Sequence, residues 1–358
     1  MDRLYTVQEQ FSEADNRLKW SRHFDGVRRE VLETGRVPLP SRATLELTMR
    51  CNLKCHMCFR DKGVSEELDT TEVKRVIDHL GAVEKVHLTG GEVFLRRDIF
   101  EILDYLDGKK VSLNTNGTLL TKDKVAKLSR YDNITRIGFS LDGLSRTHDR
   151  IRGLKHAFEK TIEAIKLTSQ SIPVSVNSMV LDENMGELDK LLALSRKLSA
   201  EEFRVELEMY STPEDIQVSK ALLGSNNCPI VTQVKVKDVY DYQLEKFIEV
   251  KERLKRLSSE LGVKIGFGPK AADIDAKEFY NGGIREQKKL ICKHLLTART
   301  NPAGNLIFCQ TIKKSFGNLM EKPLEEIWDA EEFKDFRKRL LENNLLPICK
   351  RCCRLRSI

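Results

Sequence analysis

The sequence lacks any run of about 18 apolar residues, the length that a membrane-spanning helix needs. Its first residues, MDRLYTVQEQFSEADNRLKW, include early acids and no apolar core of the kind found in signal peptides. These absences predict a cytoplasmic protein with no membrane partner. No block of lysine and arginine is interleaved with aromatic residues. The net charge of +7 therefore indicates a solvated exterior with a weak preference for anionic ligands, and no nucleic-acid partner is expected.

The chain has a globular composition, with 358 residues of which 40% are apolar and 32% charged. We expect one large α/β domain and a smaller one. Nine cysteines are present. In a reducing compartment, clustered cysteines are typical of metal ligands or catalytic thiols rather than disulfides.

Six short runs rich in β-forming residues alternate with segments of helical apolar spacing. The runs cover residues 43–49, 85–90, 110–117, 134–143, 173–181 and 202–210. This alternation predicts parallel strands joined by helical crossovers, and six repeats suit a partial (β/α)6 TIM-like barrel. Ligands of parallel α/β sheets bind at the C-terminal ends of the strands. The residues that the sequence places there include Asn114, Asn116, Ser140 and Asp142.

The chain divides into four predicted segments. Residues 1–41 form an N-terminal segment of two helices against the barrel, and residues 42–210 form the barrel itself. An irregular linker or insertion and a long charged helix occupy residues 211–281. Residues 282–358 form a small C-terminal domain with a β-hairpin and one helix. The hairpin turn is Asn301-Pro302-Ala303-Gly304, and the helix begins near Pro323.

Three cysteines lie close together after the first predicted strand. Cys51, Cys55 and Cys58 have the spacing C-x3-C-x2-C. A cubane iron–sulfur cluster normally takes one thiolate on each of its four irons, so three thiolates leave one iron open. An open coordination position is typical of a metal site that performs chemistry. The alternative is a zinc site with another cysteine or His56 as the fourth ligand, although zinc ligands usually occur as two pairs.

These cysteines carry a resemblance to a known family. Followed by Gly90-Gly91-Glu92 at the end of the second strand, the triplet resembles the radical S-adenosylmethionine (radical SAM) superfamily over most of residues 42–210. Met57 is a departure, since an aromatic residue often precedes the third cysteine. The resemblance implies that the three thiolates ligate a [4Fe-4S] cluster whose open iron binds S-adenosyl-L-methionine (AdoMet). Reductive cleavage would give a 5′-deoxyadenosyl radical, with flavodoxin or ferredoxin as the electron donor.

The resemblance also implies contacts for AdoMet. Gly90, Gly91 and Glu92 would meet its methionine amino group, since glycines let backbone carbonyls come close and a carboxylate pairs with an ammonium. Further positions match those where family members hold the ribose, the adenine and the carboxylate; they are Asn116, Ser140, Arg152 and Asn177. Of these, Ser140 or Asn177 would bond the ribose hydroxyls, and Arg152 the carboxylate. For each of the four, an ordinary strand-end cap or turn is the alternative.

A second set of cysteines lies near the C-terminus. Cys292 and Cys309 are followed by the C-x2-C pair of Cys349 and Cys352. The spacing from Cys292 through Gly304 to Cys309 resembles the opening of the SPASM domain, an auxiliary-cluster extension of radical SAM enzymes. Because the remaining SPASM spacing is missing, the shortened "twitch" version fits better, with one auxiliary [4Fe-4S] cluster on these four thiolates. A C-terminal zinc knuckle is the alternative.

Two cysteines remain outside both sets. Cys228 and Cys353 are each interpreted as a small buried apolar residue. The alternative is the donation of a hydrogen atom, as thiols do in some family epimerases.

The expected protein is an oxidoreductase-type enzyme that abstracts hydrogen from an unreactive C–H bond. Dehydrogenation, epimerisation or cross-linking of a small metabolite or a peptide would follow. Too few residues precede the first strand for a leader-binding winged-helix domain, which favours a metabolite or a peptide recognised without one. The alternative is a non-enzymatic iron–sulfur or zinc scaffold for electron transfer or partner binding. That alternative gives no reason for Gly90-Gly91-Glu92 beside the cysteines.

Overall fold

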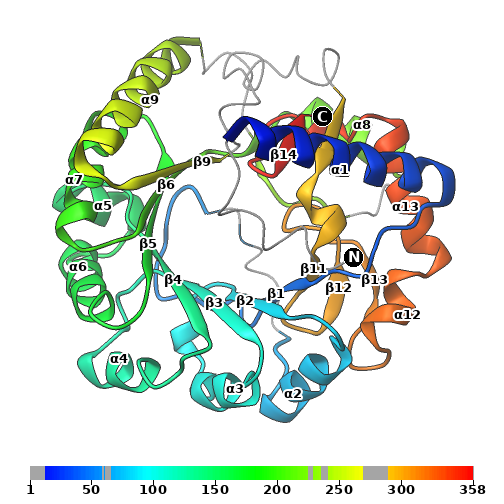
Figure 1. Ribbon diagram of the computed structural model, residues 1–358, viewed down its shortest axis with the longest axis horizontal. Helices are drawn as coiled ribbons and strands as arrows, with labels where there is room; N and C mark the ends of the chain where they lie inside the picture. The colour runs from blue at the N-terminus through cyan, green and yellow to red at the C-terminus, as the bar shows by residue number, and fades with distance from the viewer. Residues whose placement is uncertain are drawn as a thin grey trace.

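The computed structural model describes residues 13–58, 60, 66–224, 229–234, 241–268 and 289–357. Ten strands form one curved sheet, an incomplete barrel with helices along its outer face (Figure 1). The strand order is β13-β12-β11-β1-β2-β3-β4-β5-β6-β9. A two-stranded sheet, β7 (Tyr210–Ser211) with β8 (Gln233–Val234), lies apart from it.

The six predicted barrel strands are confirmed, and each is parallel to its neighbours. They are β1 Arg42–Glu46, β2 Lys85–Thr89, β3 Lys110–Thr115, β4 Ile134–Ser140, β5 Val174–Val180 and β6 Glu202–Leu207. The helices that alternate with them are α2 Thr70–His79, α3 Ile99–Tyr105, α4 Lys122–Leu128, α5 Ser145–Arg152, α6 Ala157–Thr168 and α7 Leu188–Lys197. Alternate strand residues such as Val86 and Leu88 are buried, and this apolar face forms the main core.

The sheet extends beyond β6 into the segment predicted as a linker. There β9 (Lys264–Gly268) lies parallel to β6, and the predicted long helix is α9 (Asp241–Leu261). The expectation of irregular structure is wrong for α8 (Pro213–Leu222), which begins at a capping box of Thr212 and Asp215.

The sheet also extends beyond β1. There β11 (Ala298–Thr300) pairs parallel with β1 and antiparallel with β12 (Asn305–Ile307), which confirms the predicted hairpin. Beyond it lies β13 (Ser315–Asn318), and β10 (Leu290–Cys292) pairs separately with β14 (Leu355–Ser357).

The single C-terminal helix expected from the sequence is two helices. These are α12 (Leu324–Trp328) and α13 (Glu331–Glu342). The break between them lets the rings of Trp328 and Phe333 pack edge to face, with centroids 5.2 Å apart.

One N-terminal helix, α1 (Glu13–Thr34), lies within the described residues, where two were expected in residues 1–41. It packs along α13, and Arg28 donates hydrogen bonds to Leu290 O at 2.9 Å and Leu341 O at 3.0 Å. Residues 1–12 lie outside the described part. Within the described ranges, no helix combines the length and apolar character needed to cross a membrane.

Candidate active site

The loop that follows β1 carries Cys51, Cys55 and Cys58, all partly exposed. It is fastened to the end of α5 by two backbone hydrogen bonds. Lys54 N donates to Arg152 O at 3.2 Å, and His56 N donates to Ile151 O at 3.3 Å. Met57, the departure from the family pattern, is buried in a small apolar cluster that includes Ile151. The loop therefore has a fixed position at the C-terminal edge of the barrel.

Two of these thiols contact residues that were predicted to bind AdoMet. Asn116 Nδ2, just after β3, lies 3.9 Å from Cys51 Sγ and donates to Asn52 Oδ1 at 3.0 Å. Arg152 Nη1 lies 3.8 Å from Cys55 Sγ. Burial raises the pKa of the Cys55 thiol, and the Arg152 guanidinium acts in the opposite direction.

The Arg152 side chain is already engaged by protein groups. It forms an ion pair with the buried carboxylate of Asp142, which also accepts a hydrogen bond from Met179 N at 2.8 Å. Its Nε atom is buried and has no hydrogen-bond partner among the described residues. The guanidinium therefore links β4 and α5 to the cysteine loop, and its predicted contact with the AdoMet carboxylate stays a prediction.

Gly90 and Gly91 lie directly against the backbone that leads into the cysteine loop. Gly91 N donates to Thr48 O at 2.6 Å, and Glu92 N donates to Arg50 O at 2.9 Å. A Cβ atom on Gly90, whose φ is +147°, would lie 2.3 Å from Thr48 O, and one on Gly91 would lie 2.0 Å from Arg50 O. Only glycine fits at these two positions.

The carboxylate of Glu92 joins the ends of β2 and β3. It is 1% exposed and accepts hydrogen bonds from Phe94 N at 3.1 Å, Thr115 Oγ1 at 2.8 Å and Asn116 N at 2.8 Å. Burial raises the pKa of this carboxyl, although the three hydrogen bonds oppose the shift. Glu92 therefore has a structural role that the sequence did not predict. Its contact with the methionine ammonium stays a prediction.

Ser140 and Asn177 lie opposite each other in the register of β4 and β5. Asn177 Oδ1 is buried and lacks a hydrogen-bond partner within the described ranges. A Cβ atom on the neighbouring Gly138 would lie 2.3 Å from Asn114 Oδ1 and 2.7 Å from Asn177 Nδ2. The glycine thus leaves room for two amide side chains. A buried amide oxygen of this kind favours a ligand that donates a hydrogen bond, as a ribose hydroxyl does.

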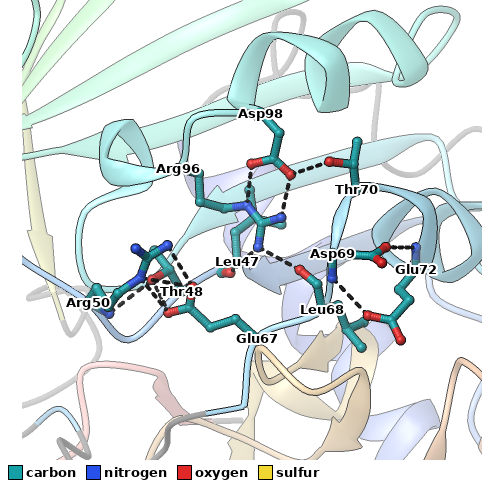
Figure 2. Close-up of polar contacts among 10 residues, drawn as sticks. All are labelled: Leu47, Thr48, Arg50, Glu67, Leu68, Asp69, Thr70, Glu72, Arg96 and Asp98. Carbon is teal, nitrogen blue, oxygen red and sulfur yellow. Dashed lines mark hydrogen bonds and ion pairs between the residues drawn. The ribbon is translucent and has the colours of Figure 1, made fainter.

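A buried arginine that the sequence analysis did not identify bonds the backbone just before the cysteine loop (Figure 2). Arg96 donates hydrogen bonds to Leu47 O and Leu68 O, both at 3.0 Å. It also donates to both carboxylate oxygens of Asp98, at 2.9 and 2.6 Å, and Asp98 accepts a further bond from Thr70 Oγ1 at 2.7 Å. The signal was an arginine and an aspartate shortly after Glu92, in the run FLRRD.

A neighbouring pair restrains the same backbone. Arg50 Nε donates to Glu67 Oε2 at 3.0 Å, and Thr48 Oγ1 also donates to the Glu67 carboxylate (Figure 2). The two networks together connect the end of β1, the segment before α2 and the turn after Gly90-Gly91-Glu92.

The second set of cysteines lies in the C-terminal part of the fold. Cys292, Cys309, Cys349 and Cys352 line one cavity. Burial raises the pKa of the Cys292 thiol, and the neighbouring thiols raise it further. Cys353 is buried beside Cys352 and is not among the residues that line the cavity. Cys228 lies outside the described residues.

Two family models match the chain. They are the radical SAM superfamily over residues 45–195 and the SPASM iron–sulfur cluster-binding domain over residues 296–353. The AdoMet-dependent heme synthase of Methanosarcina barkeri is 31% identical over 312 residues, which cover 82% of this chain and 83% of the synthase. The chain belongs to the radical SAM superfamily. It is a radical SAM enzyme with a C-terminal SPASM domain, so the scaffold alternative is wrong.

Other relatives match smaller parts or share the fold. AlbA, the antilisterial bacteriocin subtilosin biosynthesis protein of Bacillus subtilis, is 39% identical over 175 residues, which cover 46% of this chain and 39% of AlbA. The structure of Streptococcus suis SuiB bound to its precursor peptide SuiA superimposes with a TM-score of 0.63 at 15% identity, covering 91% of this chain and 72% of SuiB. That of anSMEcpe with bound AdoMet has a TM-score of 0.61 at 16% identity, covering 82% and 79%. At these identities the two structures show the shared fold.

The cofactors of this family are AdoMet with its [4Fe-4S] cluster and the auxiliary iron–sulfur centre of the SPASM domain. The residues present fit both groups. Asn177 Oδ1 offers a buried hydrogen-bond acceptor that has no protein partner among the described residues. Thiol side chains are the ligands that iron–sulfur clusters take; three occur within eight positions on the loop after β1, and four line the C-terminal cavity.

Proposed function

We propose that this chain cleaves AdoMet reductively at a cluster held by Cys51, Cys55 and Cys58, and then abstracts hydrogen from a substrate C–H bond. The observation that carries the proposal is the packing of the Gly90-Gly91 backbone against Thr48 and Arg50, which lead directly into the three-thiol loop. Three thiolates leave one iron of a cubane open, and this packing would keep that iron beside the end of β2. When bound, the cluster and AdoMet supply an electron and a 5′-deoxyadenosyl radical.

The residues around the loop would bind and orient these groups. Asn116 Nδ2 would hold the Cys51 thiolate, and the Arg152 guanidinium would stabilise the negative charge of the Cys55 thiolate. The carbonyl groups of Gly90 and Gly91 would accept bonds from the methionine ammonium. Ser140 and Asn177 would bond the ribose hydroxyls, since they face each other on adjacent strands.

We further propose one auxiliary [4Fe-4S] cluster on Cys292, Cys309, Cys349 and Cys352. Its support is the shared cavity that these four side chains line. Four thiolates would saturate a cubane, so the auxiliary cluster would pass electrons or brace the domain without binding substrate. If the reaction is a two-electron oxidation, this cluster would accept the second electron.

A carboxylate-bearing metabolite is the first proposed substrate class. Five residues lie in one register row across neighbouring strands, namely Arg299, Thr44, His87, Ser112 and Arg136. Burial lowers the pKa of His87 to about 3, and nearby arginines such as Arg299 add to the shift. Arg299 is paired with Glu46 and Arg136 with Glu202, so the row offers hydrogen-bonding groups rather than free cations. The match with heme synthase over most of both chains supports the same class.

A peptide is the second proposed substrate class, because the match with AlbA has the higher identity, 39%. The two classes are separated by adding either a carboxylate-bearing porphyrin, chosen because of the heme synthase match, or a ribosomal precursor peptide to the reduced enzyme. Substrate should increase 5′-deoxyadenosine formation several-fold and should itself lose or exchange a hydrogen.

Anaerobic incubation with dithionite and AdoMet, followed by mass spectrometry, tests the proposed chemistry. The wild-type enzyme should form 5′-deoxyadenosine and methionine, and Cys55→Ala should form neither. A Cys349→Ala variant should lose about half of the roughly eight irons expected for two cubanes and keep substrate-free cleavage. Wild-type protein that holds iron and leaves AdoMet intact under these conditions would contradict the proposal.

A further inference from the structure

Helix α8 lies beside the C-terminal knuckle that carries Cys349 and Cys352 (Figure 1). Ser219 Oγ accepts a hydrogen bond from Ile348 N at 3.1 Å, directly before the first of these cysteines. Asp215, one turn earlier on the same helix, faces the residues between the two cysteines. The helix and the knuckle are therefore joined by side chains, although about 130 positions separate them in the sequence.

The contact between Asp215 and the knuckle is a buried ion pair. Asp215 Oδ2 accepts a hydrogen bond from Arg351 Nη1 at 2.8 Å, and its Oδ1 lies 3.5 Å from Lys350 Nζ. The Asp215 and Arg351 residues are 6% and 3% exposed. The Arg351 guanidinium also stacks over the ring of Tyr210, 4.7 Å from its centroid, which leaves it little freedom to move.

Arg351 also lines the cavity of the four cysteines. A cubane with four thiolate ligands is an anion, so a fixed cation at its edge changes both its stability and its reduction potential. Burial would raise the pKa of Asp215, but the Thr212 backbone and the cations Arg351 and Lys350 lower it overall. The carboxylate is thus ionised at neutral pH, and it offsets part of the charge of the two cations.

We propose that Asp215 is a positioning residue for the auxiliary cluster: through Arg351 it fixes the Cys349–Cys352 knuckle and the charge beside it. This inference rests on the proposed auxiliary cluster. Ser219 supports the same geometry by holding the backbone at Ile348. Neither side chain is a ligand, since both act through the residues that flank the thiols.

The test compares Asp215→Asn with wild type after anaerobic reconstitution. Asparagine keeps the size and an acceptor oxygen but removes the charge that holds Arg351. A matched control is Asp189→Asn, which removes a carboxylate paired with Arg253 on helices α7 and α9. Iron per chain, the rate of iron loss to a chelator and the reduction potential of each cluster are measured by colorimetry and by EPR-monitored titration.

We expect Asp215→Asn to lose auxiliary iron at least several-fold faster than wild type and to raise the auxiliary potential. The cluster on the first cysteine loop and substrate-free AdoMet cleavage should be unchanged, and Asp189→Asn should match wild type throughout. Ser219→Ala is a milder second variant, to be used if Asp215→Asn fails to fold. It too should accelerate auxiliary iron loss.

Two failures of this test can be told apart. If wild type and Cys349→Ala hold equal iron, the proposed auxiliary cluster is wrong. If wild type holds about eight irons and Asp215→Asn keeps both the auxiliary iron and its potential, the cluster stands and the role of Asp215 is refuted. Equal effects of Asp215→Asn and Asp189→Asn would also refute it.

Discussion

Replacement of Arg96 by alanine is the sharpest test of how the cysteine loop is held. Arg96 contacts three separate segments, since it donates to the carbonyls of Leu47 and Leu68 and to the carboxylate of Asp98 (Figure 2). Its side chain is 5% exposed, so water cannot readily replace these bonds. The variant therefore frees the end of β1, the segment before α2 and the turn after Gly90-Gly91-Glu92 at the same time.

The expected cost follows from the bonds that are lost. Each buried carbonyl left without its donor costs about 1–3 kcal/mol, and loss of the Asp98 partner adds a smaller amount because Asp98 also bonds Thr70. We expect Arg96→Ala to lower the free energy of unfolding by about 3 kcal/mol, within the 5–15 kcal/mol of a typical domain. Arg96→Lys keeps the charge but not the planar fork, and should lose about half as much.

The free energy of unfolding of the cluster-free protein is measured by denaturant titration, and AdoMet binding by the reconstituted protein is measured in parallel. The order wild type, Arg96→Lys, Arg96→Ala should hold for both quantities, while auxiliary iron stays constant. An Arg96→Ala variant within about 0.5 kcal/mol of wild type, with unchanged AdoMet affinity, would refute the reasoning.

The ion pair between Arg96 and Asp98 also makes the stability of the protein depend on pH. Burial would raise the pKa of Asp98, but Arg96 and Thr70 lower it below its ordinary value of 3.8. A lowered folded-state pKa stabilises the protein above pH 3.8, and that contribution is lost as the pH falls through the folded-state value. Below pH 4, the Asp98→Asn variant should therefore lose less stability than wild type as the pH falls. Arg96→Ala should show the same smaller loss.

Two further predictions follow from buried positions near the site. Gly91→Ala should destabilise the protein by about 1–3 kcal/mol and abolish AdoMet binding, because the new Cβ atom would lie 2.0 Å from Arg50 O. The control is Gly186→Ala, whose new Cβ atom would have no atom within 4 Å. It should be nearly neutral in the same denaturation and binding assays. His148 accepts a hydrogen bond from Asp142 N, and burial, with Arg152, lowers the pKa of its imidazole from 6.5 to about 3. The unfolded chain therefore takes up a proton that the folded chain does not, so stability falls as the pH drops from 6.5 toward 3, by up to about 1.4 kcal/mol per pH unit. His148→Asn keeps an acceptor and should remove this part of the slope; an unchanged slope in denaturant titrations across that range would contradict it.

The barrel strands were predictable because their signal is local. The run KVHLT has its buried residues at alternate positions, and the helices between strands carry their own apolar spacing. The pairing of β11 with β1 was not predictable, since no local pattern tells a three-residue strand which of several edges it will join. The helix α8 could have been found, because Thr212, Pro213 and Asp215 form a helix-start signal.

The site was predictable to the extent that chemistry fixes residue type. Thiols that ligate iron and glycines that let two backbone segments approach closely can be recognised in the sequence by their spacing, as at Cys51 and Gly91. Arg96 and Asp215 were missed because arginine and aspartate are common surface residues, and only their burial against distant segments gives them a role. Long-range polar contacts leave no periodic trace in the sequence.

The first cysteine set and Cys309 of the second set are joined through one sheet rather than through a linker. The first set follows β1 directly, and Cys309 lies two residues beyond β12, whose partner β11 pairs with β1. At the end of β1 the buried Glu46 carboxylate accepts a bond from Arg299 Nε at 2.7 Å and lies 3.2 Å from Lys313 Nζ. Breaking such a buried pair leaves an uncompensated charge at a cost of about 3–5 kcal/mol. Motion of Cys309 relative to the first set would have to break this pair and the strand pairing beneath it, so the sheet couples these two positions.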